Sequence, residues 1–286
     1  MKMFTRRRFF EALVGWPLLS FLTLRIPKIM ANPSPPWAEG GKRSIAEFFR
    51  GEELLYEIGF WLFKRAALGR LSFRPGEKKG QYVALLETQT LGVLGFVTRY
   101  RVDTYRSTME EIEGGSRFRS LLFEENVKVG NQFDKRVTQF DYPSQKWITL
   151  KWGKNGVIQR IEEEIPPGKI YDDFLTSCCN FRYGVYGAIE RGRTYRIPTF
   201  PRKGSTSYEV TVASKNEENE KRRSEKTKDE KEFFVKLILG PEITHSKEGR
   251  IEGWLSKELL PVEGKLKDVF LFGDVKGTLI KNNKNS

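Results

Sequence analysis

The sequence predicts a mainly β protein: a curved antiparallel sheet, or an open or flattened β-barrel, with a helical segment packed on it. From residue 53 onward, short runs rich in aromatic and β-branched residues alternate with turns that contain Gly, Pro, Asn or Asp. One stretch, residues 172–189, has the length and the acidic N-terminal residues typical of a helix. Many short strands with turns between them indicate an antiparallel sheet that curls or closes.

The first 31 residues resemble a twin-arginine signal peptide. Thr5 precedes Arg6 and Arg7, one free position and the apolar pair Phe9-Phe10. The apolar run that follows, residues 12–24, is shorter than the ~20 residues that a membrane-spanning helix needs. We therefore expect a protein exported to the periplasm, with the twin-arginine export machinery as a partner. An uncleaved signal would instead leave the protein tethered to the membrane.

A linker and a short helix, residues 32–49, should precede the domain. Residues 32–42 are rich in Pro and Gly, and Ser44 with Glu47 forms a capping-box pattern. Residues 91–98 are apolar and are predicted to form a second short helix. Asn155-Gly156 is a strong hairpin signal. The strands predicted before the main helix are residues 53–60, 67–73, 82–90, 103–112, 118–127, 133–142, 146–152 and 157–164.

A second group of strands should complete a single domain over residues 50–281, followed by a polar tail, 282–286. Residues 215–232 contain seven basic, seven acidic and no apolar residues. Such a segment cannot bury apolar surface, so it is predicted to be a mobile hairpin insertion. The strands predicted after the main helix are residues 194–200, 207–214, 232–239, 250–256, 261–270 and 274–280.

The order of several short motifs resembles the exported bacterial domain-of-unknown-function family numbered 3108. The motifs are Gly51-Glu52-Glu53-Leu54-Leu55-Tyr56-Glu57-Ile58, Tyr100-Arg101-Val102-Asp103, Pro166-Pro167-Gly168, the segment 192–200, Gly253-Trp254-Leu255-Ser256 with Pro261-Val262, and the segment 273–279. The resemblance implies an antiparallel β protein that is curved like an open barrel and covered by helix. It supplies no function. The chain departs from the family at Asp172-Asp173-Phe174-Leu175, where Asp-Pro-Leu-Ser is usual.

The residues give no sign of a cofactor, a metal site or a catalytic centre. His245 is the only histidine, and the two cysteines are neighbours, which is a poor supply of zinc ligands. The chain contains neither a dinucleotide-binding fingerprint nor a P-loop. Its formal net charge is +13, of which residues 1–31 contribute +5. In an exported protein this charge favours anionic lipids and glycans as partners, and we expect no nucleic acid.

The cysteine pair allows two interpretations. Cys178 and Cys179 could form a redox-sensitive vicinal disulfide, although one peptide unit holds their α-carbons closer than ordinary bridge geometry requires. Alternatively, they are small buried side chains within the predicted helix.

The leading hypothesis is a non-catalytic cell-envelope protein that binds an amphiphilic or anionic ligand, a lipid or a glycan. Tyr56, Trp61 and Trp254 could line a cavity in the curled sheet, and Arg101 could meet an anionic group. Aromatic residues in strands could equally be ordinary core. The arginines could belong to a solvated strand face.

Two alternatives remain open. A hydrolase of envelope polymers would need paired carboxylates, for which Asp134 with Asp141, or residues within 162–164, are the candidates. A structural partner in a polysaccharide or lipoprotein export machine would instead display an apolar patch or an unpaired sheet edge.

Overall fold

The computed structural model of the chain describes residues 43–60, 63–153, 156–202, 205–225, 231–239, 249–269 and 273–283. The predicted export signal with Arg6 and Arg7, and also Trp61 and His245, lie outside these ranges. No helix within the ranges is both long enough and apolar enough to span a bilayer.

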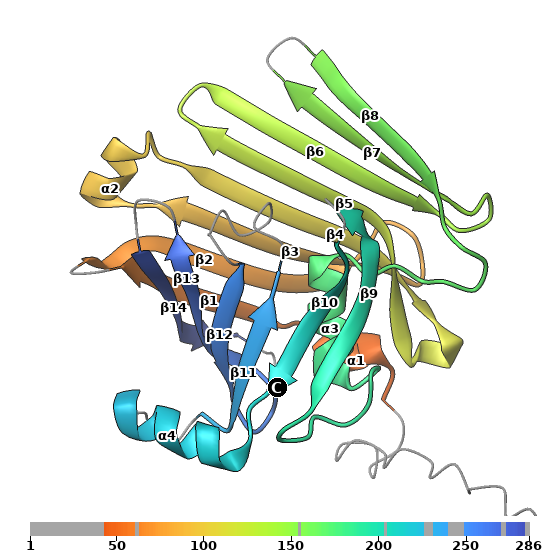
Figure 1. Cartoon of the computed structure of the whole chain (residues 1–286). Coiled ribbons are helices and arrows are strands. Elements are labelled where there is room, and N and C mark those ends of the chain that lie inside the picture. The colour runs from red at the N-terminus through yellow and green to blue at the C-terminus, as the bar shows by residue number, and fades with distance from the viewer. Residues whose placement is uncertain are drawn as a thin grey trace, which may run out of the picture. The chain divides into compact units, whose positions relative to one another are not determined.

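The strands form one antiparallel sheet in the order β8-β7-β6-β5-β4-β3-β2-β1-β14-β13-β12-β11-β10-β9 (Figure 1). The first eight strands are β1 (Glu53–Phe60), β2 (Phe63–Pro75), β3 (Gln81–Thr90), β4 (Val102–Ile112), β5 (Arg117–Val129), β6 (Gln132–Asp141), β7 (Lys146–Gly153) and β8 (Gly156–Glu164). The others are β9 (Thr194–Arg202), β10 (Ser205–Val212), β11 (Phe233–Ile238), β12 (Arg250–Leu255), β13 (Pro261–Val269) and β14 (Gly273–Asn282). The predicted mainly β class, a curved antiparallel sheet with helix packed on it, is confirmed.

In the described ranges, the α-helices that accompany the sheet are α1 (Ile45–Phe49), α2 (Gly92–Val97), α3 (Phe174–Tyr183) and α4 (Lys215–Glu225). The Ser44 capping box of α1 is present as predicted. The main helix α3 is shorter than the predicted 172–189, because Asp173 caps its N-terminus and Gly184 ends it in the left-handed region at φ 85°. Glycine adopts this conformation without steric cost, so the chain leaves the helix there.

Helix α3 lies inside the curl of the sheet and is buried on both sides. Leu175 and Cys179 belong to a core with α1 and β2–β7, which includes Phe118 and Trp147. Phe181 belongs to a second core, formed on β9–β12. Each large apolar side chain buried in this way contributes about 1.5–3 kcal/mol relative to an exposed one. The internal helix therefore joins the two parts of the sheet.

The edge strand β9 packs against β6 and β7 without forming a β ladder. Phe200 of β9 packs against Phe140 of β6 and Trp147 of β7, with ring centroids 5.3 and 5.5 Å apart. Next to this contact, the Asp172 amide donates to the Pro198 carbonyl at 3.1 Å. Side-chain packing and one loop hydrogen bond therefore bring β9 to the far part of the sheet, which remains open between β8 and β9.

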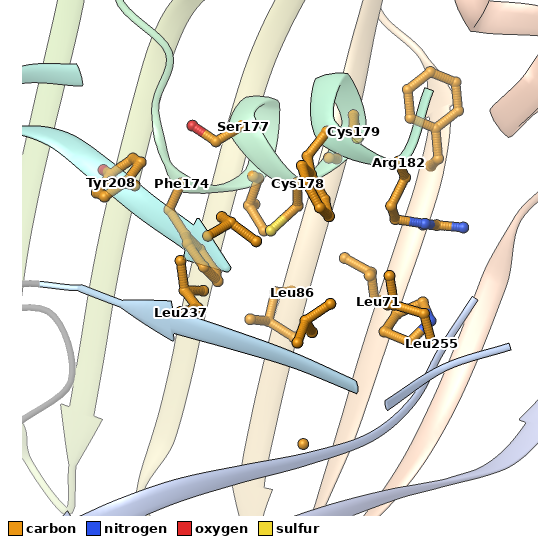
Figure 2. Close-up of a pocket in the computed structure, with 18 of the residues that line it drawn as sticks. Leu71, Leu86, Phe174, Ser177, Cys178, Cys179, Arg182, Tyr208, Leu237 and Leu255 are labelled. Atoms are coloured by element: carbon orange, nitrogen blue, oxygen red, sulfur yellow. The ribbon is translucent and has the colours of Figure 1, made fainter. Parts of the chain in front are cut away.

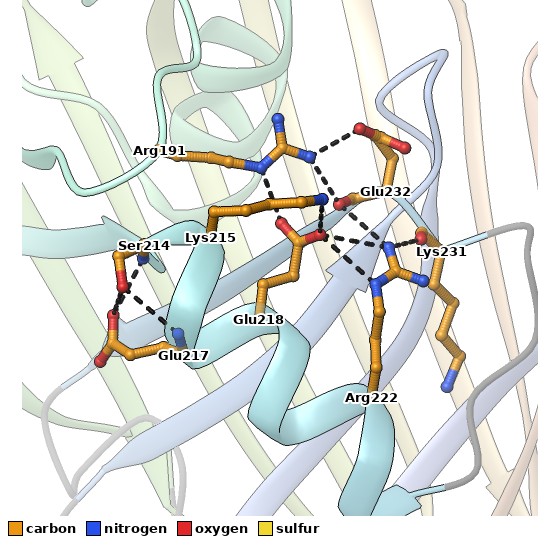
Figure 3. Close-up of polar contacts among 8 residues, drawn as sticks. All are labelled: Arg191, Ser214, Lys215, Glu217, Glu218, Arg222, Lys231 and Glu232. Carbon is orange, nitrogen blue, oxygen red and sulfur yellow. Dashed lines mark hydrogen bonds and ion pairs between the residues drawn. The ribbon is translucent and has the colours of Figure 1, made fainter.

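The predicted mobile hairpin at 215–232 is wrong for residues 215–225, which form helix α4. The segment does connect two antiparallel neighbours, β10 and β11. Sequence patterning missed the helix because no apolar face marks it. Ion pairs hold it instead: the Glu218 side chain, although fully buried, contacts Arg191, Lys215 and Arg222 at 2.8, 2.8 and 3.3 Å (Figure 3).

Helix α4 covers the outer face of the sheet, opposite α3. Phe234 and Trp254 pack there with their ring centroids 5.0 Å apart. The Trp254 indole donates to Glu225 at 3.2 Å, and the Arg222 guanidinium lies 4.8 Å from the centroid of its ring. The charged helix thus shields an aromatic pair that would otherwise face water.

We expect Glu218→Ala to release α4 from the sheet. The change removes a buried carboxylate whose charged hydrogen bonds are worth about 1.5–3 kcal/mol each, although its cationic partners can partly rehydrate. Hydrogen exchange should accelerate in residues 215–225 and at Phe234, and less in β1–β8. Glu220→Ala, at an exposed position of the same helix, is the matched control. Equal exchange in the two variants would contradict the anchoring role of Glu218.

Candidate functional site

The inner face of the sheet encloses an apolar cavity of about 370 Å³ beside α3 (Figure 2). Its walls come from β1–β3 on one side, from β9–β14 on the other and from α3 between them. Residues labelled in Figure 2 that line it include Leu71, Leu86, Phe174, Cys178, Tyr208, Leu237 and Leu255. The lining is almost entirely carbon, so the cavity favours an apolar occupant over water.

A second cavity of about 500 Å³ adjoins the first. The two cavities share Leu86, Phe174 and Leu239 as lining residues. The second cavity extends toward the end of the sheet where β3 passes into α2, and Leu94 of α2 lines it. The polar side chains of Thr88, Thr90, Thr98, Arg101 and Asp103 appear only here. Together the cavities form an apolar interior with one more polar end.

A row of three glycines crosses the cavity side of the sheet. Gly253 of β12 pairs with Gly264 of β13, which pairs with Gly277 of β14. Gly264 and Gly277 line the first cavity. A Cβ added at Gly264 would have no atom within 4 Å, and one at Gly277 would make only ordinary contacts at 3.9 Å. The absence of side chains at Gly264 and Gly277 therefore leaves empty a part of the interior that larger residues would fill.

Arg101 is the one predicted ligand-binding residue that the structure places at the polar end. Its Nε donates to both carboxylate oxygens of Asp103, at 2.8 and 3.0 Å. Its two terminal nitrogens make no hydrogen bond to other described residues, so they are available to an anion. Of the other arginines considered with it, Arg106 pairs with Glu124 at 3.0 Å and Arg99 is exposed.

The predicted aromatic residues do not form one site. Tyr56 lines the first cavity, but its hydroxyl donates to the Pro261 carbonyl at 2.8 Å, and burial raises the pKa of this phenol. The placement of Trp254 in the cavity was wrong: it lies under α4 on the outer face, because alternation along β12 points it away from Leu255.

The vicinal disulfide, one of the two interpretations of the cysteine pair, is not formed, and both cysteines are free thiols. Both belong to α3, whose regular backbone directs neighbouring side chains about 100° apart. Cys178 points into the cavity (Figure 2), and burial raises its pKa to about 12. A thiol with a raised pKa is a poor nucleophile at neutral pH. The alternative interpretation, small side chains in a helix, describes the pair: Cys179 is buried, and Cys178 is half-buried at the cavity.

A buried ion pair closes the cavity beside Tyr56. Arg182 of α3 donates to both oxygens of Glu52, at 2.6 and 2.8 Å, and to the Leu259 carbonyl at 2.8 Å. Both charged side chains are buried. Since each nitrogen of the guanidinium already donates to a partner, Arg182 positions α3 and is not free to hold an anionic ligand.

Two adjacent carboxyl groups at the N-terminus of α3 are also buried. Asp173 accepts from the Leu175 and Thr176 amides and from the hydroxyls of Ser107 and Ser120 at 2.6 and 2.8 Å. Asp172 accepts from Asn180, and burial raises its pKa to about 6. Neither residue lines a cavity, so these groups hold the helix in place. The sequence marked them only as helix caps.

The carboxylates considered for hydrolysis do not form a catalytic pair. Asp134 and Asp141 lie near opposite ends of β6, about 23 Å apart at ~3.3 Å per residue. Glycoside hydrolysis needs a separation of roughly 5–10 Å. Glu162 is paired with Lys146 and Arg160 on the surface of β8. Among the described residues, no group of three or more His, Cys, Asp or Glu side chains could hold a metal ion.

Arg182→Met should destabilise the fold by about 3–5 kcal/mol, because it leaves the Glu52 carboxylate buried without its partner. Glu52→Leu combined with Arg182→Met should restore most of this loss by removing both charges. Urea unfolding of Arg182→Met, Glu52→Leu and the double variant measures the coupling free energy between the two side chains. Additive losses in the double variant would show that the pair does not act as a unit.

Asp172 should make stability fall as the pH rises. Its folded-state pKa of about 6 exceeds the ordinary 3.8, so its stabilising contribution is complete below pH 3.8 and is lost as the pH passes 6. The stability of the wild type relative to Asp172→Asn should therefore decrease between these values, by on the order of 1–3 kcal/mol.

Asp141→Asn provides the control for urea unfolding across this pH range. Hydrogen bonds from Ser144 lower the pKa of Asp141 below its ordinary value, so its contribution to stability is already present above pH 3.8, and the stability of the wild type relative to this variant should stay nearly constant between pH 3.8 and 6. The same slope in both comparisons would contradict the assignment to Asp172.

Comparison with known proteins finds a likeness to a solved structure. No protein-family model and no curated protein matches the chain. Among solved structures, the chain is similar to a β-barrel-like protein of domain of unknown function DUF1849 from Brucella abortus, with 13% identity and a TM-score of 0.43. The match covers 82% of this chain and 98% of the other.

Proposed function

We propose that this chain is a non-catalytic periplasmic protein of the cell envelope that binds an amphiphilic lipid. The observation that carries the proposal is the pair of adjoining apolar cavities with one polar end. Ligand sites for small molecules are typically apolar cavities of about 300–1,000 Å³ with a few polar groups that fix orientation. An acyl chain would occupy the apolar interior, and its headgroup would lie near Arg101.

The size of the cavities supports an acyl chain. An apolar cavity of about 150 Å³ stays dry and holds a benzene molecule, and each cavity here is more than twice as large. Each buried methylene contributes about 0.8 kcal/mol. Ten methylenes would therefore supply roughly 8 kcal/mol before the costs of binding, a free energy that corresponds to a Kd of about 1 μM.

The polar end supports an anionic headgroup. Asp103 holds Arg101 in place and leaves two guanidinium nitrogens to donate. Hydrogen bonds in which one partner is charged are shorter and stronger than neutral ones. Thr88, Thr90 and Thr98 also line this cavity, although the Thr98 hydroxyl is engaged by Thr90 at 2.8 Å.

A glycan suits the interior less well than a lipid. Sugar hydroxyls would lose their hydrogen bonds to water against walls of Leu, Phe and Val, and each unsatisfied group would cost about 1–3 kcal/mol. The predicted export signal and the basic surface support an envelope location. Both are properties of the sequence, and the periplasmic location belongs to this proposal.

Gly264→Leu tests the proposal directly. The new side chain would enter the open space at the glycine row, so we expect the variant to fold and to lose lipid. Thr278→Leu adds the same side chain at an exposed position of β14 and is the matched control. The full chain and both variants are purified from a bacterial periplasm and measured by native mass spectrometry, followed by lipid extraction.

A lipid adduct in the wild type and in Thr278→Leu, reduced at least tenfold in Gly264→Leu, is the expected result. A bare mass in the wild type, with no lipid in the extract, would overturn the proposal. An adduct that Gly264→Leu leaves unchanged would place the lipid outside the cavities. Thermal unfolding shows whether each variant is folded.

A further inference from the structure

The end of the sheet that carries α2 displays a group of exposed apolar side chains. Val93, Phe96 and Val97 of α2 are 73%, 74% and 69% exposed. Tyr100, directly after the helix, and Phe133, near the start of β6, are also exposed. We call these five residues the apolar tip. Exposed apolar residues concentrated in this way mark a contact with a membrane or a protein.

The tip has a defined structure. The Tyr100 ring packs against Gly95, and its amide donates to the Gly95 carbonyl. Arg99 and Tyr100 are consecutive non-glycine residues in the left-handed region, at φ 54° and 50°. The Gly130 amide donates to the Arg99 carbonyl at 2.9 Å, which joins α2 to the turn between β5 and β6. Strained backbone of this kind persists where the surrounding structure holds it, often at functional positions.

Basic side chains surround the apolar tip. Arg99 lies over the β5–β6 turn, where an added Gly130 Cβ would be 3.4 Å from its side chain. Lys128 pairs in register with Phe133 across β5 and β6. Both cations are exposed, and neither forms an ion pair with another described residue. Apolar residues that enter a bilayer, bordered by cations that meet anionic headgroups, are the two features of an interfacial membrane contact.

The tip is also continuous with the polar end of the second cavity. Leu94 of α2 and Thr98, the C-cap residue of that helix, line the cavity, and the same helix exposes Phe96 to solvent. A bilayer in contact with Phe96 would therefore lie next to the side chains that border the cavity. We infer that the apolar tip, with Arg99 and Lys128, docks the protein onto an anionic bilayer surface.

Docking goes beyond the proposed lipid binding and does not depend on it. An environment-sensitive fluorophore at Phe96→Cys in the full chain reports the contact locally, whatever residues 1–31 contribute to binding. Burial raises the pKa of both native thiols, so they should react slowly. The same label at Ile280→Cys, on an exposed apolar position of β14, is the matched control.

The probes are vesicles of phosphatidylcholine alone and vesicles in which about one lipid in three is the anionic phosphatidylglycerol. We expect a blue shift at position 96 with the anionic vesicles and little at position 280. Arg99→Gln and Lys128→Gln should each raise the lipid concentration at half-maximal shift about fivefold.

No shift at position 96 would overturn the inference and would favour a protein partner for the tip. Equal shifts at positions 96 and 280, or shifts with neutral vesicles alone, would overturn it as well. The labelled Phe96→Cys chain carrying Gly264→Leu separates the two proposals, because it should still dock after it has lost its lipid. If the wild type retains its lipid adduct but position 96 shows no shift with vesicles, the docking inference fails and the proposed function stands.

Discussion

The buried N-terminus of α3 is the constraint on which the rest of the structure depends. A helix enclosed by a sheet must satisfy its first amide groups without water. Asp173 does so with one carboxylate oxygen, while the other accepts hydroxyl groups from β4 and β5. The same residue therefore caps the helix and fixes its position on the sheet. Leu175 and Phe181 then face different parts of the sheet, so the strands must curl around the helix to bury both.

The cavity follows from this arrangement. Helix α3 separates the two walls of the curl, and the ion pair between Arg182 and Glu52 holds its second half. Such a pair contributes more to a defined position than to stability, because both charges are desolvated. The glycine row at Gly253, Gly264 and Gly277 then leaves part of the interior unfilled. Protein interiors are otherwise packed as densely as organic crystals, so a space of this size requires such a cause.

The two faces of the sheet have different chemistry. The inner face contacts an apolar interior, whereas the outer face around α4 is held by charged groups such as Glu218 and Lys221. Charged partners exposed to water form weak individual pairs, but a buried carboxylate shared by several cations can fix a helix that has no apolar face. At the α2 end of the sheet, some apolar side chains are exposed to solvent and others line the second cavity. The exposed apolar side chains of α2 therefore lie beside residues that line the second cavity.

The sequence by itself determined the β class, most strand positions, the cap at Ser44 and an acidic cap at Asp172 or Asp173, because alternation and capping act over a few residues. Tertiary structure decided the site. Gly264 and Gly277 lie on different strands, and only the register between β13 and β14 makes them neighbours. Trp254 looked like a cavity residue until strand direction placed it on the outer face. The helix at 215–225 depended on cations from other elements, such as Arg191. Local patterns cannot encode which face a strand presents or which distant charge a carboxylate meets, because both are fixed only when the sheet curls around α3.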